Sequence, residues 1–127
     1  MMYSESTRRY FNHPSAAGAG SGPHWFRGQA GSRRQGTWVQ FDVHAPGGEL
    51  IRSARFLAFG CPHVIAVSQW VAEQAPGRAV AAAHLPESVP ALQARFEVPV
   101  EKLGRLLVVE DAWIAALRAV CEARISR

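Results

Sequence analysis

The chain has 127 residues, 48% hydrophobic and 19% charged, as in a single globular domain spanning residues 1–127. No apolar run could span a bilayer, and the N-terminus lacks the features of a secretory signal, so we expect a cytoplasmic protein with no membrane partner. The net charge of +4 comes from scattered basic residues with only two arginine doublets, Arg8-Arg9 and Arg33-Arg34, which argues against nucleic acid as a partner.

Residues 4–12 predict a short helix, with Ser4 as its N-cap and Tyr10 and Phe11 as its apolar anchor. Pro14 ends this helix. The stretch 15–23 is rich in Ala, Gly and Ser and has no periodicity, which predicts a flexible loop.

Two runs of extended character follow. In residues 37–43, an apolar set of side chains occupies every second position, which indicates a half-buried strand. Its apolar set is Val39, Phe41 and Val43, alternating with Trp38, Gln40 and Asp42. A short turn at 45–48 joins this run to a second strand, Leu50 to Phe59, and therefore predicts an antiparallel hairpin.

The second half of the sequence is helical. Pro62 suits the first position of a helix, so Cys61 falls at or beside an N-cap and the helix runs to about Gln74. Residues 78–84 and 87–96 predict two short helical pieces. A last helix from near Lys102 or Leu106 to about Ala123 has a buried stripe at helical spacing, namely Val109, Ala112, Trp113, Ala116, Leu117 and Val120. Strands followed by helices predict an α+β fold, an antiparallel sheet of about three strands with helices on one face.

Cys61 is the most informative candidate for chemistry. The positive end of a helix dipole and free backbone amides both favour a thiolate at such a position. A small buried hydrophobe at a strand–helix corner explains the residue equally well. His63, two residues on, is a candidate to assist the thiol or ligate a metal beside it, although a surface histidine is the simpler interpretation.

The remaining cysteine and histidines suggest no site. Cys121 lies mid-helix at the edge of the apolar stripe, which favours a structural role. The other histidines share no metal-ligand spacing; they are His13, His24, His44 and His84.

Short motifs spread over nearly the whole chain resemble, in their order and spacing, those of one known protein family. They are Tyr3-Ser4-Glu5, Tyr10, Pro14, Gly18, Ala54-Arg55-Phe56, Phe59-Gly60-Cys61, Gly77, Pro99, Lys102 and Glu110-Asp111-Ala112. Together they resemble the U-type scaffold proteins of iron–sulfur cluster assembly, IscU and the N-terminal domain of NifU. The resemblance implies an α+β fold of the IscU and SufE type with a cluster site at one end of the sheet.

The resemblance also implies a degenerate ligand set. The family holds a nascent cluster or zinc with three cysteines, an aspartate and often a histidine, and Cys61 matches the second cysteine. Gln35-Gly36-Thr37 stands where the family has Cys-Gly-Asp, and Gly104-Arg105 where it has His-Cys. Gln35 and Thr37 are weak ligands, Gly104 has no side chain, and Arg105 only donates. An iron–sulfur cluster or zinc is therefore a cofactor by resemblance only, and none is firmly predicted.

An arginine at position 105 would repel a metal ion beside Cys61 but would stabilise a thiolate or persulfide there. Three functions stay open, none of them a turnover enzyme. The first is a divergent scaffold, the second a sulfur acceptor similar to the E-type partners of cysteine desulfurases, and the third a non-catalytic modulator of the assembly machinery.

The resemblance implies a cysteine desulfurase as the partner. It puts recruitment of the assembly chaperone in doubt, because the family's Leu-Pro-Pro-Val-Lys motif is only partly kept as Val98-Pro99-Val100-Glu101-Lys102.

Overall fold

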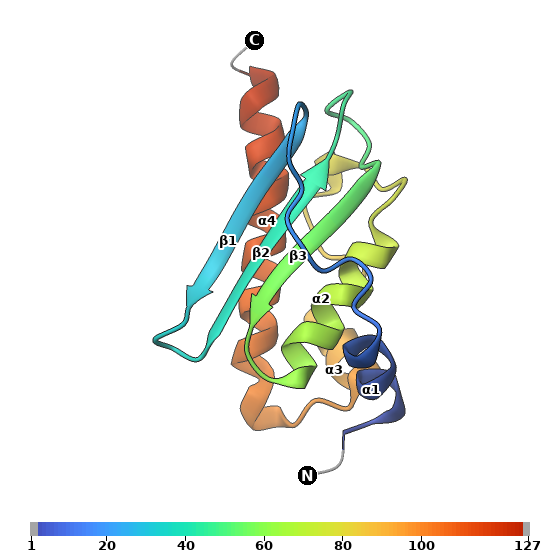
Figure 1. The fold of residues 1–127 in the computed structure, drawn as a ribbon, viewed down its shortest axis with the longest axis vertical. Helices are drawn as coiled ribbons and strands as arrows, with labels where there is room; N and C mark the ends of the chain where they lie inside the picture. Colours follow the sequence, from blue (N-terminus) through green and yellow to red (C-terminus); the bar gives the residue numbers. More distant parts are fainter. Residues whose placement is uncertain (1–2, 126–127) are drawn as a thin grey trace.

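The structure is a computed structural model that describes residues 3–125, drawn in Figure 1. Its elements in chain order are α1 (Glu5–Asn12), β1 (Trp25–Ser32), β2 (Thr37–His44), β3 (Ser53–Phe59), α2 (Pro62–Gln74), the 3₁₀ turn η1 (Val80–Ala82), α3 (Val89–Phe96), the 3₁₀ turn η2 (Val100–Lys102) and α4 (Leu103–Ile125). Within this part of the chain, none of the helices combines the length and the apolar character needed to cross a membrane.

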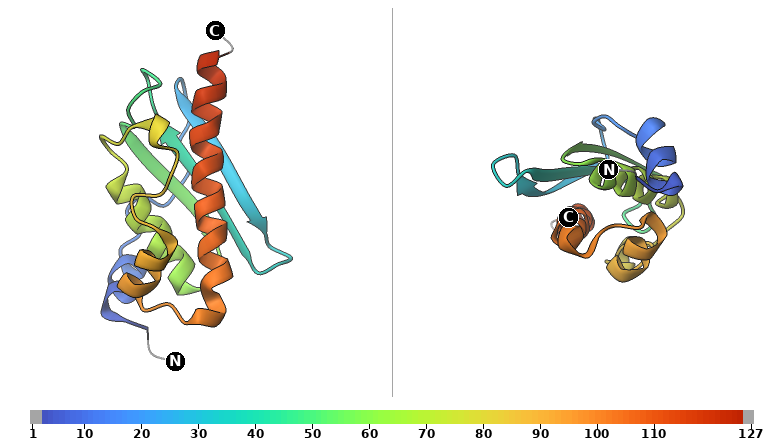
Figure 2. Two further views of the ribbon diagram at one scale, coloured as in Figure 1. Left: turned by 180° about the vertical axis from the view of Figure 1, so that it is seen from behind. Right: turned by 90° about the horizontal axis from the view of Figure 1, so that it is seen from below.

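The three strands form one antiparallel sheet in the order β1-β2-β3, which confirms the predicted α+β class. Helices α2 and α4 cover one face of this sheet, as the views in Figure 2 show. The predicted stripe of α4 faces the sheet, and all six of its members are buried. The ring of Trp113 meets that of Phe41 edge to face, with centroids 5.1 Å apart. The core therefore lies between β2 and these two helices.

The N-terminal segment crosses the opposite face of the sheet (Figure 1). Phe56 N–H donates to the carbonyl of Ala16, and Gly18 N–H donates to that of Phe56, so the segment runs beside β3. Further on, Gly20 N–H donates to the carboxylate of Asp42 at 2.8 Å. The flexibility proposed for residues 15–23 stays a prediction, but the stretch is hydrogen-bonded to the sheet.

The prediction that β2 is half-buried is wrong, because the N-terminal segment covers the second face of this strand. Gln40 and Asp42 on the second face are as buried as the apolar set on the first. Asp42 is satisfied there because Arg27 Nε donates to it at 2.8 Å and Gly20 N–H adds a further bond. A polar residue in an alternating pattern is therefore not always a solvated one.

Strand β1 was not predicted from the sequence, and it pairs with the whole length of β2. Strand β3 also begins at Ser53 rather than Leu50. Ile51 N–H donates to the carbonyl of Arg78, and Leu50 bridges Ala79, so this stretch pairs with the loop after α2 instead of with β2. The same contacts explain why the helix predicted over 78–84 is only the turn η1.

The other helix boundaries match the predictions closely. Ser4 caps α1, its Oγ accepting from Thr7 N–H, and Ser88 caps α3. The apolar anchor of α1 needs one correction: Tyr10 packs edge to face on Phe96, but Phe11 is 38% exposed. The face of α1 toward the core instead contains Thr7, whose hydroxyl donates to the carbonyl of Phe96.

Candidate functional site

One end of the sheet brings four chain segments together. Strand β2 begins there at Thr37 and β3 ends there at Phe59, since Trp38 pairs with Phe59. Cys61 follows at once as the N-cap of α2, as the sequence predicted. The beginning of α4 at Leu103 comes to the same end of the molecule (Figure 1).

Cys61 is a half-buried free thiol packed against the core. Burial raises the pKa of this thiol, but the backbone N–H groups of Val64 and His63 and the side chain of Arg105 lower it, and the net shift is downward. Arg105 acts through both a hydrogen bond and its charge. The sulfur is therefore biased toward thiolate by the start of α2 and by a cation from α4.

His63 is buried beside this thiol, with its Nδ1 3.9 Å from the Cys61 sulfur. Burial lowers the pKa of His63, and the charges of Lys102 and Arg105 lower it further. The Tyr3 ring meets the imidazole edge to face, with centroids 4.8 Å apart. His63 is therefore a neutral partner for Cys61, not the exposed histidine that its position in the first helical turn indicated.

The four positions matched to lost ligands also come together. Gln35, Thr37, Gly104 and Arg105 line one open pocket of about 240 Å³, with Glu101 and Val108 completing its wall. Cys61 does not line this pocket. Arg105 links the two, because its side chain borders the pocket and lies close enough to Cys61 to lower the pKa of the thiol.

These residues do not suit a metal ion or cluster. In the described part of the chain, no three His, Cys, Asp or Glu side chains come close enough to share a metal. The guanidinium of Arg105 carries a fixed positive charge and offers only donors, so it opposes a cation beside Cys61. The arrangement instead suits an anion held on the sulfur.

An exposed apolar patch adjoins the site and was not recognised from the sequence. Leu57 and Phe59 of β3 are 38% and 45% exposed. The guanidinium of Arg33, from the turn between β1 and β2, lies 5.6 Å from the centre of the Phe59 ring. In the sequence, Leu57 and Phe59 alternate with Phe56 and Ala58, and this alternation is the signal that could have placed them on the other face of the strand.

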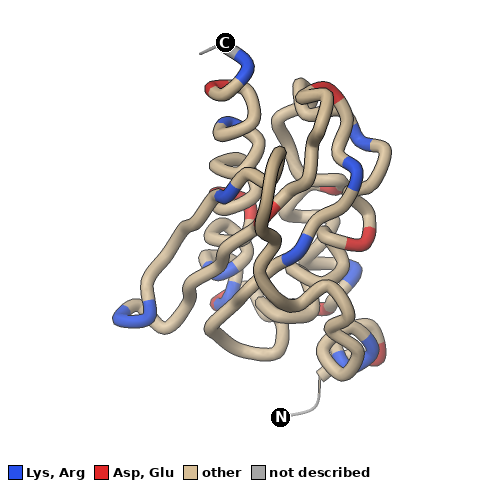
Figure 3. Tube along the Cα trace, turned by 45° about the horizontal axis from the view of Figure 1, so that its top comes forward, with Lys and Arg blue, Asp and Glu red and all other residues tan. Residues whose placement is uncertain are grey.

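The remaining candidates lie elsewhere. Cys121 is a half-buried residue of α4 packed against the core, consistent with a structural role. His44 stacks on Trp25, with centroids 5.0 Å apart, and His84 contacts the carbonyl of Leu85. Among the residues that the structure describes, basic positions are spread out and do not form one stripe, as Figure 3 shows.

Comparison with known proteins gives one family and one fold. The family model described as NifU-like N terminal domain matches residues 2–122. A nitrogen-fixing NifU-like protein (N-terminal) from Brucella abortus is 17% identical, with a TM-score of 0.72 over 94% of each chain. A putative iron–sulfur cluster assembly scaffold protein for the SUF system from Fervidobacterium islandicum is also 17% identical, with a TM-score of 0.68 over 93% of this chain and 96% of that one. No curated protein matches the chain.

Proposed function

Because the chain belongs to the family of the NifU-like N-terminal domain, we propose that it is a scaffold-like protein of iron–sulfur cluster assembly with Cys61 as its working group. It holds sulfur on this one thiol instead of a complete cluster on several ligands. A cysteine desulfurase is the proposed sulfur donor, and the cytoplasm, where thiols stay reduced, is the proposed compartment. The protein is a stoichiometric carrier and not a turnover enzyme.

The observation that carries this proposal is the contact between Arg105 and Cys61. Hydrogen bonding and charge from Arg105 favour the anionic sulfur, in a position that the family resemblance assigns to a metal ligand. A persulfide on Cys61 is also anionic, so the same contact stabilises the sulfur-loaded form. The neutral imidazole of His63 adds no second positive charge beside the sulfur.

The proposed step is an exchange between two sulfur atoms with no net oxidation. The Cys61 thiolate attacks the terminal sulfur of a cysteine persulfide on the desulfurase and forms a new S–S bond. The S–S bond of the donor breaks, and the donor cysteine leaves as a thiolate. Cys61 then carries the persulfide beside Arg105.

Access to the thiol is consistent with a protein donor. Cys61 is only half-buried, and the exposed Phe59 and Leu57 lie on the preceding strand. Apolar and aromatic side chains at a site rim are typical of surfaces that bind another protein. A chaperone is not part of the proposal, because Glu101 and Val100 interrupt the motif that recruits one in the family.

Mass spectrometry after incubation with a cysteine desulfurase and free cysteine tests this function. We expect the mass of one added sulfur atom on Cys61, removable by a thiol reductant. Cys121→Ser is the matched control and should still load, whereas Cys61→Ser should not. Sulfur on Cys121 instead, or on neither cysteine, would contradict the proposal. A change in desulfurase rate without sulfur transfer would then identify the protein as a modulator.

A further inference from the structure

A second pocket lies at the opposite end of the sheet from Cys61, where the loop after α2 passes α4. Its volume is about 130 Å³, and it is formed by Trp113 and Leu117 of α4, by Ile51, and by four residues between 78 and 84. We propose that this Trp113 pocket binds a small amphipathic carboxylate, with an apolar group about the size of one six-membered ring inside and the carboxylate toward Arg78.

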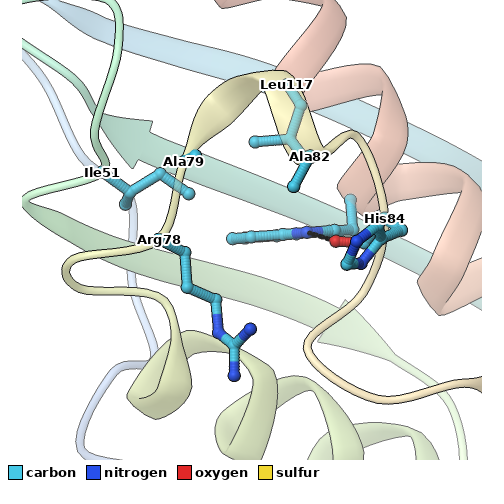
Figure 4. A pocket seen from close by; sticks show the side chains of 7 residues that line it. Ile51, Arg78, Ala79, Ala82, His84 and Leu117 are labelled. Atoms are coloured by element: carbon cyan, nitrogen blue, oxygen red, sulfur yellow. Dashed lines mark hydrogen bonds between the residues drawn. The ribbon is translucent and has the colours of Figure 1, made fainter.

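The apolar half of the pocket limits the size of the ligand. Figure 4 shows Ile51, Ala79, Ala82 and Leu117 on one side of it. Ile51 and Leu117 are almost fully buried, while the two alanines, being small, leave the space between them open. An apolar cavity of about 150 Å³ accommodates benzene, so a hollow of this size takes one ring or a short branched chain.

The walls are fixed in place by hydrogen bonds. Ile51 N–H donates to the carbonyl of Arg78 at 2.9 Å, and Gly77 N–H donates back to Ile51 at 2.8 Å. On the other side, Trp113 Nε1 donates to the carbonyl of His84 at 3.1 Å. A ligand therefore enters a pocket that is already formed, which lowers the entropic cost of binding.

The charged half of the pocket favours an anion. Arg78 Nε donates to the carbonyl of Gln74 at 3.0 Å, and within residues 3–125 its side chain makes no other hydrogen bond and no ion pair. Its terminal amino groups are thus available to a carboxylate, which matches the planar guanidinium. His84 Nδ1 donates to the carbonyl of Leu85 at 2.7 Å, which holds the imidazole in place at the edge of the pocket.

Titration with phenylacetate, followed by the indole N–H resonance of Trp113 in ¹H–¹⁵N spectra, tests the inference. The chain has four tryptophans, and Trp113→Phe assigns the resonance. We expect a saturable shift in the millimolar range. Benzyl alcohol, which keeps the ring but lacks the charge, should bind roughly fivefold more weakly, the factor that a partly exposed ion pair supplies.

Variants separate the two halves of the pocket. Arg78→Gln should reduce phenylacetate to the affinity of benzyl alcohol, whereas Arg8→Gln, the same change on α1, should have no effect. Ala82→Leu and Ala79→Leu, at exposed positions, should fill the pocket and abolish both titrations while leaving the rest of the spectrum unchanged. An absent or unsaturable shift, equal binding of the acid and the alcohol, or full binding in both leucine variants would overturn the proposal. Cys61→Ser should not change any of these results, because this pocket is separate from the thiol.

Discussion

Arg105, in the first turn of α4, lies beside the thiol of Cys61, at the N-cap of α2, and helps the backbone N–H groups of Val64 and His63 to lower the pKa that burial raises. The two residues belong to helices that begin at the same end of the sheet. The start of α2 and the cation from α4 therefore act on the thiol in the same direction.

Removing the positive charge of Arg105 should therefore slow the alkylation of Cys61. In a Cys121→Ser background, we expect Arg105→Ala to reduce the rate of Cys61 alkylation by iodoacetamide at neutral pH by up to about fivefold, the scale of a partly exposed charge pair. The midpoint of the rate–pH profile should rise. Arg33→Ala removes a cation that lies over Phe59 and is the control. The idea fails if Arg105→Ala leaves the profile unchanged and wild-type labelling begins only near the ordinary thiol pKa of about 8.5.

The amount of metal that the purified protein binds should depend on how many of the family's ligands it has. We expect anaerobically purified wild-type protein to hold at most substoichiometric zinc, because one thiolate and an optional histidine fall short of four ligands. The triple variant Gln35→Cys, Thr37→Asp, Arg105→Cys puts the family residues back around one pocket and should bind about one zinc per chain. Adding Cys61→Ser to this variant should weaken the site. A wild-type cluster that resists a mild chelator would contradict the argument.

His63 should make stability depend on pH. Its pKa is lowered first by burial and then by Lys102 and Arg105, so the unfolded chain takes up a proton near the ordinary value of 6.5, before the folded chain does as the pH falls. The free energy of unfolding should therefore be unaffected above this pH and should fall as the pH drops below it.

His63→Phe keeps a ring against Tyr3 but cannot titrate, so we expect it to flatten this decline in urea unfolding between about pH 7 and about pH 5. His13→Phe, at the exposed C-cap of α1, is the matched control and should leave the decline in place. An equally steep decline in His63→Phe would show that other groups cause it.

Two glycines should respond in opposite ways to the same substitution. A Cβ at Gly28 of β1 would overlap the backbone of α4 at Ala115 and Ala116, whereas one at Gly104 would meet nothing within 4 Å. We expect Gly28→Ala to lower the free energy of unfolding by about 1–3 kcal/mol or more through overpacking. Gly104→Ala, in the first turn of α4, should raise it by up to about 0.5–1 kcal/mol. Urea unfolding measures both, and a tolerated Gly28→Ala would mean that α4 can move away from the sheet.

The sequence by itself determined the features that depend on neighbours in the chain. The placement of Cys61 before Pro62 set the start of α2, and the caps Ser4 and Ser88 are short-range hydrogen bonds. The buried stripe of α4 could be read because helical spacing repeats locally. Alternation similarly identified β2, although it could not tell a solvated Asp42 from a buried one.

The tertiary structure decided what depends on segments far apart in the chain. Strand β1 is rich in glycine and polar residues, and it forms because β2 pairs with it and α4 packs against Gly28. The burial of Asp42, the contact of Arg105 with Cys61 and the Trp113 pocket each join elements that are distant in sequence. No local pattern encodes such a contact, because periodicity and capping report which face of an element is buried but not what packs against it.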